Sequence, residues 1–283
     1  MRLGVVLMGL GAHAAASAGA LEWMLDAGVR PYALCGMQSA AWASALYLAG
    51  YDARGIKAAV MQAACLGRRL LPAQRSARKL LAGKTDALCT GRRLEKLLLA
   101  QLGERMMSCS PQQGVFLTKA ARSGHTVVFS TRACPQNADA ILTLQASLSF
   151  AARAAMARPP FLSAMDWMGA PLLPVDDADF ACRLLLKMGA QRVLVIAPQN
   201  SIRHEPDALE QASGLTDGLC GQVLSENAGI LRVMLDDRCG ALSLERIAEC
   251  AQTGKNAAAQ NMEAALERLG MPLCRVLPFR KMV

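Results

Sequence analysis

The first fifty residues contain two strand–turn–helix units in succession, and this arrangement restricts the fold more than any other feature. An apolar run from Leu3 to Met8 is followed by a glycine-containing turn and by an apolar helical stretch that ends at Gly28. A second apolar run, Pro31 to Cys35, is followed by a turn and a helical stretch that ends at Gly50. Strand–turn–helix units of this kind place neighbouring strands in parallel. The sequence therefore predicts an α/β fold with a parallel sheet and crossover helices.

Further along the chain, apolar runs and helical periodicity predict more elements. Residues 54–122 are expected to be mostly helical, and residues 137–157 to form one long helix. A hairpin is expected over residues 164–173. We also expect strands over 125–131, 192–197 and 230–235, and helices over 179–188, after Pro206, over 242–252 and over 257–269. The chain shows no internal repeat or long linker. It is therefore interpreted as one domain, residues 1–283, with a basic helical insert at about 52–122 and a C-terminal helical part at about 205–283.

Composition limits the classes of function. Ten cysteines are scattered without any C-x-x-C pair, and there are only three histidines, so we expect no metal site and no cofactor. The cysteines are interpreted as buried thiols in a reducing cytoplasm. The run from Leu3 to Leu10 also imitates a secretory signal, but three glycines within or just beyond it favour a buried strand. No later apolar stretch has bilayer-spanning length, so we expect a cytoplasmic protein, with peripheral membrane attachment as an alternative.

Basic residues gather in one segment of a chain whose net charge is +9. Between Arg54 and Lys96, eleven basic residues are opposed by two acidic ones, and leucines are interleaved with them. The segment is either a cationic amphipathic surface for anionic lipid or an acidic partner, or a solvated helical face. Its candidate contact residues are Arg68, Arg69, Arg75, Arg78, Lys79, Arg92 and Arg93. No aromatic residue lies between Tyr51 and Phe116, which argues against base stacking and nucleic-acid binding.

Two stretches near the N-terminus carry a resemblance to a known family. The first turn reads Gly9-Leu10-Gly11-Ala12-His13-Ala14, and GALEWMLDAGV follows at residues 19–29. The second strand and helix read CGMQSAAWASALYLAG at residues 35–50. This order resembles the start of bacterial patatin-like phospholipases, which have a Gly-Gly-Gly-x-Arg-Gly loop, a helix and then a Gly-x-Ser-x-Gly elbow. The resemblance implies a three-layer sandwich with helices on both faces of a mainly parallel sheet.

The resemblance also places a glutamine at the position of the family's nucleophile. Counting back from Gly50 puts Gln38 where the family has serine, and Ala40 on the second glycine of the elbow. Ser39 lies one residue late. The tip of such an elbow presents a single side chain, so Ser39 could serve as nucleophile only if the loop gained a residue before it. Otherwise Ser39 is expected to cap the following helix.

The loop that would form the oxyanion hole is altered as well. Its residues are Gly9, Leu10, Gly11, Ala12 and His13. Leu10 stands where the family has its middle glycine, and backbone angles that suit glycine can be closed to leucine. His13 stands where the family has arginine, and we expect its side chain to face solvent rather than the pocket.

The second half of the family's catalytic dyad is also substituted. Residues 154–161, AAMARPPF, and the hairpin at 168–173 match a family segment that leads to Asp-Gly-Gly. Without a gap, the family's aspartate falls on Pro174, which cannot accept a proton. Asp176 and Asp177 lie close by as substitutes, and Asp166 offers a rival register.

Three functions follow from this pattern. The favoured one is a protein related to lipid acyl hydrolases that is catalytically inactive and binds a lipid, an acyl ligand or a protein partner. The second is an active serine hydrolase that uses Ser39 with Asp176, Asp177 or Asp166. The third is a membrane-surface scaffold that uses the basic helices.

Overall fold

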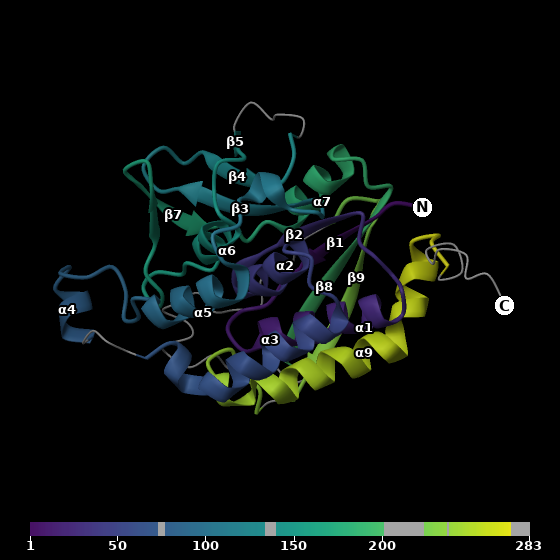
Figure 1. Ribbon diagram of the computed structural model, residues 1–283, viewed down its shortest axis with the longest axis horizontal. Coiled ribbons are helices and arrows are strands. Elements are labelled where there is room, and N and C mark those ends of the chain that lie inside the picture. The colour runs from purple at the N-terminus through teal and green to yellow at the C-terminus, as the bar shows by residue number, and fades with distance from the viewer. Residues whose placement is uncertain (73–76, 134–139, 201–223, 237, 273–283) are drawn as a thin grey trace.

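The two N-terminal apolar runs form the middle of one sheet (Figure 1). The computed structural model describes residues 1–72, 77–133, 140–200, 224–236 and 238–272. Its strands are β1 (Leu3–Leu7), β2 (Ala33–Gly36), β3 (Gly114–Ala120), β4 (Thr126–Ser130), β5 (Ala140–Thr143), β6 (Met165–Trp167), β7 (Ala170–Pro174), β8 (Arg192–Asn200) and β9 (Ala228–Leu235). Within the described residues they form a nine-stranded sheet in the order β5-β4-β3-β2-β1-β8-β9, where β7 pairs with β3 and β6 pairs with β7.

Most neighbouring strands are parallel, as the repeated strand–turn–helix pattern predicted. β1 lies between β2 and β8 and is parallel to both, and all five of its residues are buried. The β2–β3, β8–β9 and β4–β5 pairs are also parallel. Antiparallel pairing occurs where β3 meets β4 and β7, and within the β6–β7 hairpin. The mainly parallel α/β fold is therefore confirmed.

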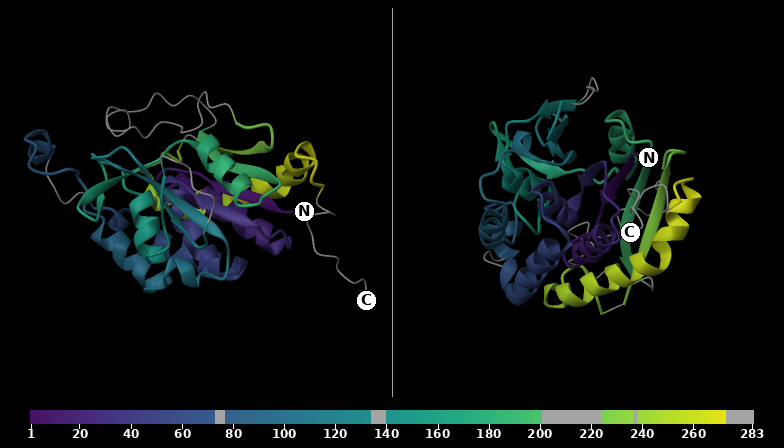
Figure 2. Two further views of the ribbon diagram at one scale, coloured as in Figure 1. Left: turned by 90° about the horizontal axis from the view of Figure 1, so that it is seen from above. Right: turned by 45° about the vertical axis from the view of Figure 1, so that its right-hand side comes forward.

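Helices cover both faces of the sheet (Figure 2). They are α1 (His13–Asp26), α2 (Ala41–Leu48), α3 (Ala53–Leu66), α4 (Ala77–Leu81), α5 (Arg92–Leu102), α6 (Leu148–Ala155), α7 (Ala178–Lys187) and α9 (Ile247–Arg268), with short 3-10 turns η1 (Gln38–Ala40), η2 (Gly67–Leu70), η3 (Met107–Cys109) and η4 (Leu244–Arg246). Val5 and Leu7 of β1 pack in one buried cluster with α1, α2 and α9, while Val6 packs in a second cluster with α7. This alternation of side chains produces the three layers.

Two glycines let α1 and α9 cross at close range. A Cβ added to Gly19 of α1 would collide with the carbonyl oxygen of Ala251, and one added to Gly254 of α9 would collide with that of Ala16. Lys255 of α9 strengthens the contact, since its Nζ lies 2.5 Å from Glu22 Oε1 of α1. The crossing matters for the site because α1 begins directly after the loop of residues 9–12.

Three stretches differ from the sequence predictions. Residues 54–122 contain β3, whose residues pair with β2 on one side and β4 on the other. The long helix expected over 137–157 is β5 followed by α6, because the Ser147 hydroxyl accepts the Phe150 N–H and starts a new helix. The two helices expected over 242–269 are the single helix α9. Gly254 does not end it, because the missing Cβ serves the crossing with α1. The helix predicted after Pro206 falls in 201–223, outside the described residues.

No helix among the described residues combines the length and the apolar character needed to cross a bilayer.

Candidate functional site

Gln38 lies at the tip of a sharp turn between β2 and α2. Met37 before it is extended, and Gln38 itself has φ 54°, in the left-handed region that residues other than glycine rarely adopt. Its side chain is buried, with 3% of the residue exposed. A strained residue that turns the chain from strand to helix is the geometry of a nucleophile elbow. The elbow here presents an amide instead of a hydroxyl.

The Gln38 side chain uses both ends of its amide. Its Oε1 accepts a hydrogen bond from the Gly9 N–H at 3.3 Å, and its Nε2 donates to Asp176 Oδ1 at 2.9 Å. The other carboxylate oxygen, Asp176 Oδ2, lies 2.6 Å from Arg158 Nη1. An ionised carboxylate only accepts, so the amide must turn its NH₂ toward Asp176. Gln38 therefore bridges the glycine loop to a carboxylate that an arginine also holds.

The carboxylate that meets Gln38 lies two residues beyond the position indicated by the ungapped alignment. Pro174 is the last residue of β7 and pairs with Thr118 of β3, so it is still part of the sheet. Asp176 lies two residues beyond the end of this strand. Asp177 accepts the Phe180 N–H and caps α7, and Asp166 accepts the Gly169 N–H inside the hairpin.

Ser39 contacts the glycine loop rather than a helix end. Its Oγ accepts a hydrogen bond from the Gly11 N–H at 2.9 Å. Neither η1 nor α2 has a side-chain cap at its N-terminus, so the expectation that Ser39 caps the helix was wrong.

The glycine loop turns at its two glycines and not at Leu10. Positive φ occurs at Gly9 (140°) and Gly11 (50°), and Leu10 is not among the described residues with positive φ. The leucine side chain is buried and sits at a position that tolerates a Cβ. A Cβ on Gly11, by contrast, would collide with the Ala241 carbonyl oxygen, which also accepts the Ala12 N–H at 2.8 Å.

His13 is buried, so the expectation that it faces solvent was wrong. Only 7% of the residue is exposed, and its Nε2 lies 2.6 Å from the Cys239 carbonyl oxygen. The ring therefore anchors the start of α1 to the segment that precedes η4. The sequence offered no signal for this contact, because residues 13 and 239 are distant in the chain.

The backbone donors of the loop that point toward the elbow are occupied. Gly9 donates to Gln38 and Gly11 donates to Ser39. In an acyl hydrolase, such donors must be free to bind the oxygen that becomes negative in the transition state. Here the elbow's own side chains satisfy them.

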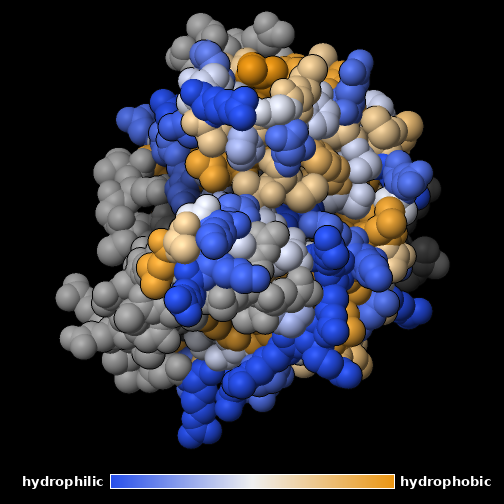
Figure 3. All heavy atoms as spheres, turned by 90° about the vertical axis from the view of Figure 1, so that its left-hand side faces the viewer, coloured by the Kyte–Doolittle hydropathy of each residue, from blue (hydrophilic) through white to orange (hydrophobic). Residues whose placement is uncertain are grey.

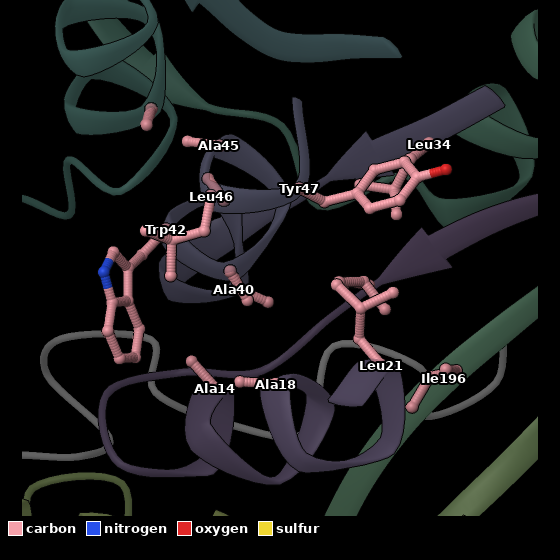
Figure 4. Packing of buried hydrophobic residues seen from close by; sticks show 14 of the residues in the cluster. Ala14, Ala18, Leu21, Leu34, Ala40, Trp42, Ala45, Leu46, Tyr47 and Ile196 are labelled. Carbon is pink, nitrogen blue, oxygen red and sulfur yellow. The ribbon is translucent and has the colours of Figure 1, made fainter. Parts of the chain in front are cut away.

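An apolar pocket opens beside the elbow. It encloses about 450 Å³ of space that includes open solvent. Its lining comes from Gly11, Ala14, Ala15, Ser39, Trp42, Ala63, Leu70, Leu71, Leu94, Leu97, Met156, Leu244 and Ile247. Ser39 is the single polar side chain in this set. Figure 4 shows Trp42 of α2 reaching toward Ala14 of α1, and the Trp42 indole N–H is held by Gln101 Oε1 at 2.7 Å.

An ion pair joins two of the turns that line the pocket. Arg68 of η2 forms two hydrogen bonds of 2.9 Å with the Glu245 carboxylate of η4. These turns also supply the lining residues Leu70 and Leu244. The hydrogen bonds from Arg68 lower the pKa of Glu245 to about 2.

Burial disfavours the reactive thiolate form of two cysteines, Cys35 and Cys182. Burial raises the pKa of Cys182 to about 12, and it raises the pKa of Cys35 further. A protonated thiol is a poor nucleophile and a poor metal ligand. Among the described residues, no three His, Cys, Asp or Glu side chains cluster as metal ligands would.

Comparison with solved structures identifies the fold. VipD from Legionella pneumophila superposes with a TM-score of 0.50 at 12% identity, over 93% of this chain and 67% of that one. The chain has the patatin-like fold. Human group IVD cytosolic phospholipase A2 matches with a TM-score of 0.48 at 13% identity, over 97% of this chain and 60% of that protein. ExoU of Pseudomonas aeruginosa, in its complex with SpcU, matches with a TM-score of 0.43 at 13% identity, over 94% of this chain and 52% of that one.

The chain thus spans about two thirds of VipD and less of the other two. No family model matches it, and no curated protein sequence does. At 12% identity the likeness to VipD shows the fold alone, and activity depends on the residues of the site.

Proposed function

We propose that this patatin-like protein is catalytically silent and binds an acyl chain in the pocket beside Ser39. The observation that carries the proposal is the position of Gln38. Its amide fills the place where an ester would meet the nucleophile, the loop donors and the carboxylate.

The elbow lacks the chemistry of ester cleavage. A glutamine amide does not attack esters, and removing a serine nucleophile costs about six orders of magnitude in turnover in a well-studied serine protease. Asp176 is bound by both Gln38 and Arg158, and neither contact leads to a hydroxyl. The Gly9 and Gly11 donors are occupied as well. The groups at the positions of the nucleophile, the carboxylate and the loop donors are therefore all hydrogen-bonded within the protein.

Ser39 is a weak candidate for an alternative nucleophile. Its oxygen accepts the Gly11 N–H, whereas Asp176 Oδ1 accepts a hydrogen bond from Gln38 Nε2. A serine needs an adjacent base to be activated. An assay on short p-nitrophenyl esters tests this alternative directly. Turnover by the wild type that Ser39→Ala abolishes would overturn the silent assignment.

The pocket suits a single hydrocarbon chain. Each methylene moved from water into an apolar site contributes about 0.8 kcal/mol, so every methylene that enters the pocket favours binding before the costs of association are counted. Ser39 lies in the lining and accepts one hydrogen bond from Gly11. Its own O–H can donate to a ligand carboxylate or carbonyl. The ligand would then place its polar end at Ser39 and its chain among the leucines.

A bulky residue inside the pocket tests acyl binding. Ala63 of α3 lines the pocket and is buried, while Ala58 of the same helix is exposed. We expect Ala63→Phe to weaken binding of a fluorescent fatty acid at least tenfold, because a ring would occupy the space of several methylenes. Ala58→Phe carries the same helix-propensity cost and should leave the affinity unchanged. Equal affinity of Ala63→Phe and wild type would refute binding in this pocket.

A further inference from the structure

We propose that one side of the molecule is a docking surface for bilayers that contain anionic lipid. The surface, called the basic wall below, consists of residues on η2, α4 and the start of α5. Its described members are Arg68, Arg69, Arg78, Lys79, Leu81, Arg92 and Arg93. Arg75 falls in 73–76, outside the described residues. Docking stands on this surface alone and does not require the pocket to be filled.

The basic wall belongs to a segment in which positive charge predominates. Residues 54–96 include eleven basic and two acidic side chains. Glu95 Oε1 lies 3.2 Å from Nε of the buried Arg153, and the exposed Asp86 accepts the Ala164 N–H. Glu245 of η4 pairs with one member of the wall, Arg68. The segment therefore keeps an excess of positive charge, which an anionic lipid surface attracts.

The basic wall is also the outer side of the pocket. Leu70 and Leu94 face the pocket, while their neighbours Arg69 and Arg93 are exposed. Arg93 Nη1 donates to the Arg69 carbonyl oxygen at 3.1 Å, which ties η2 to the start of α5. Figure 3 faces this side of the molecule and shows hydrophilic side chains gathered beside apolar patches. Lipid drawn to the cations would thus lie next to the acyl pocket.

The basic wall has an apolar tip. α4 projects from the body of the molecule in two perpendicular views (Figures 1 and 2). Leu81 at its end is 88% exposed. Arg78 and Lys79 precede this leucine, and Lys84 follows it, all exposed. An exposed leucine among cations fits the interface of a bilayer, where the alkyl group enters the acyl boundary and the cations meet phosphates.

One of the cations is unfavourable for its helix. Arg92 is the first residue of α5, where the helix dipole is positive and a basic side chain lowers the stability of the helix. Helix stability therefore does not explain Arg92. The lack of aromatic residues between Tyr51 and Phe116 disfavours a nucleic acid, and the exposed Leu81 favours a partner with an apolar interior.

Vesicle sedimentation tests the proposal with the full chain. We expect binding to phosphatidylcholine vesicles that contain phosphatidylglycerol, weaker binding as salt is raised, and no binding to phosphatidylcholine alone. Arg92→Glu should lower the partition coefficient by at least about fivefold, the effect of losing one charge near such a surface. Leu81→Ser should lower it about tenfold.

A matched control separates the basic wall from net charge. Arg268 is exposed on the last turn of α9, at the opposite end of the molecule from α4 (Figure 1). Arg268→Glu makes the same change in net charge as Arg92→Glu and should leave vesicle binding close to wild type. Arg92→Glu should also melt at the same temperature as wild type or higher, since the change suits the helix dipole, so its loss of binding would not come from unfolding.

Several results would overturn the docking proposal. Absence of binding to anionic vesicles would do so, as would equal losses for Arg92→Glu and Arg268→Glu. Binding to single-stranded nucleic acid without vesicle binding would replace the bilayer by another polyanion. Acyl binding that survives all of these variants would leave the pocket proposal intact, so the two proposals fail separately.

Discussion

The loop of residues 9–12 is held by hydrogen bonds to side chains on one side and by close backbone packing on the other. We expect the two sides to differ in how well they tolerate substitutions. On the elbow side, Gln38 and Ser39 accept hydrogen bonds from its N–H groups. On the other side, Ala241 accepts the Ala12 N–H, and α1 packs against α9 through residues that lack a Cβ. The polar side tolerates new residues if each donor keeps a partner, whereas the packed side has no room for an extra atom. The loop is therefore held on one side by hydrogen bonds to side chains and on the other side by packing that leaves no room for a Cβ.

The largest effect is expected on the packed side. Gly254→Leu should destabilise the protein by about 3 kcal/mol or more, because its Cβ would meet the Ala16 carbonyl oxygen and force the helices apart. Thermal or urea unfolding measures the change. Ala264→Leu, on the exposed face of the same helix, should stay close to wild type. If Gly254→Leu lowered the unfolding free energy only slightly, the α1–α9 crossing would be able to relax. The packed side of the loop would then tolerate substitution as well as the hydrogen-bonded side.

An intermediate effect is expected at the elbow. Gln38→Ala should cost about 1–3 kcal/mol, because it removes the hydrogen bonds that Gln38 makes to the Gly9 N–H and to Asp176 Oδ1. Gln38→Gly loses the same contacts but accepts φ 54° without strain, so it should be less destabilising than Gln38→Ala by about 1 kcal/mol. Unfolding free energies of both variants decide the point. Equal stability of Gln38→Ala and wild type would mean that the bridge does not hold the loop.

The smallest effect is expected at the exposed Arg68–Glu245 pair. The pKa of Glu245 is lowered in the folded protein from 4.5 to about 2, so the pair stabilises the fold above pH 4.5 and loses this contribution as the pH falls toward 2. Arg68→Gln should lower the melting temperature slightly at neutral pH, by much less than Gln38→Ala does. The difference from wild type should shrink between pH 4.5 and 2. A difference that grows with acid would contradict this assignment.

Much of the fold follows from short-range sequence patterns. The strands β1 and β2 lie within two residues of their predicted bounds, because apolar runs mark buried strands. The helices α1 and α2 end within two residues of Gly28 and Gly50, the glycines predicted to end them. Predictions failed where contacts with a segment distant in the sequence, and not the local sequence pattern, determined the secondary structure. Two helices were expected over 242–252 and 257–269, but residues 247–268 form the single helix α9, which crosses α1 closely at Gly254. Residues 114–120 were included in a helical segment, but β2 and β4 pair with them as a strand.

The sequence by itself determined that an amide follows β2 at the turn, since the count from Gly50 is purely local. Only the tertiary structure decided what that amide meets. Pro174 pairs with β3, whereas Asp176 lies beyond the end of β7 and contacts Gln38. Arg158, in the loop after α6, contacts the same carboxylate. His13 likewise contacts the carbonyl oxygen of Cys239, more than two hundred residues away in the sequence. Helix and strand signals act over a few residues, whereas a buried polar group takes the partner that chain folding brings within hydrogen-bond distance.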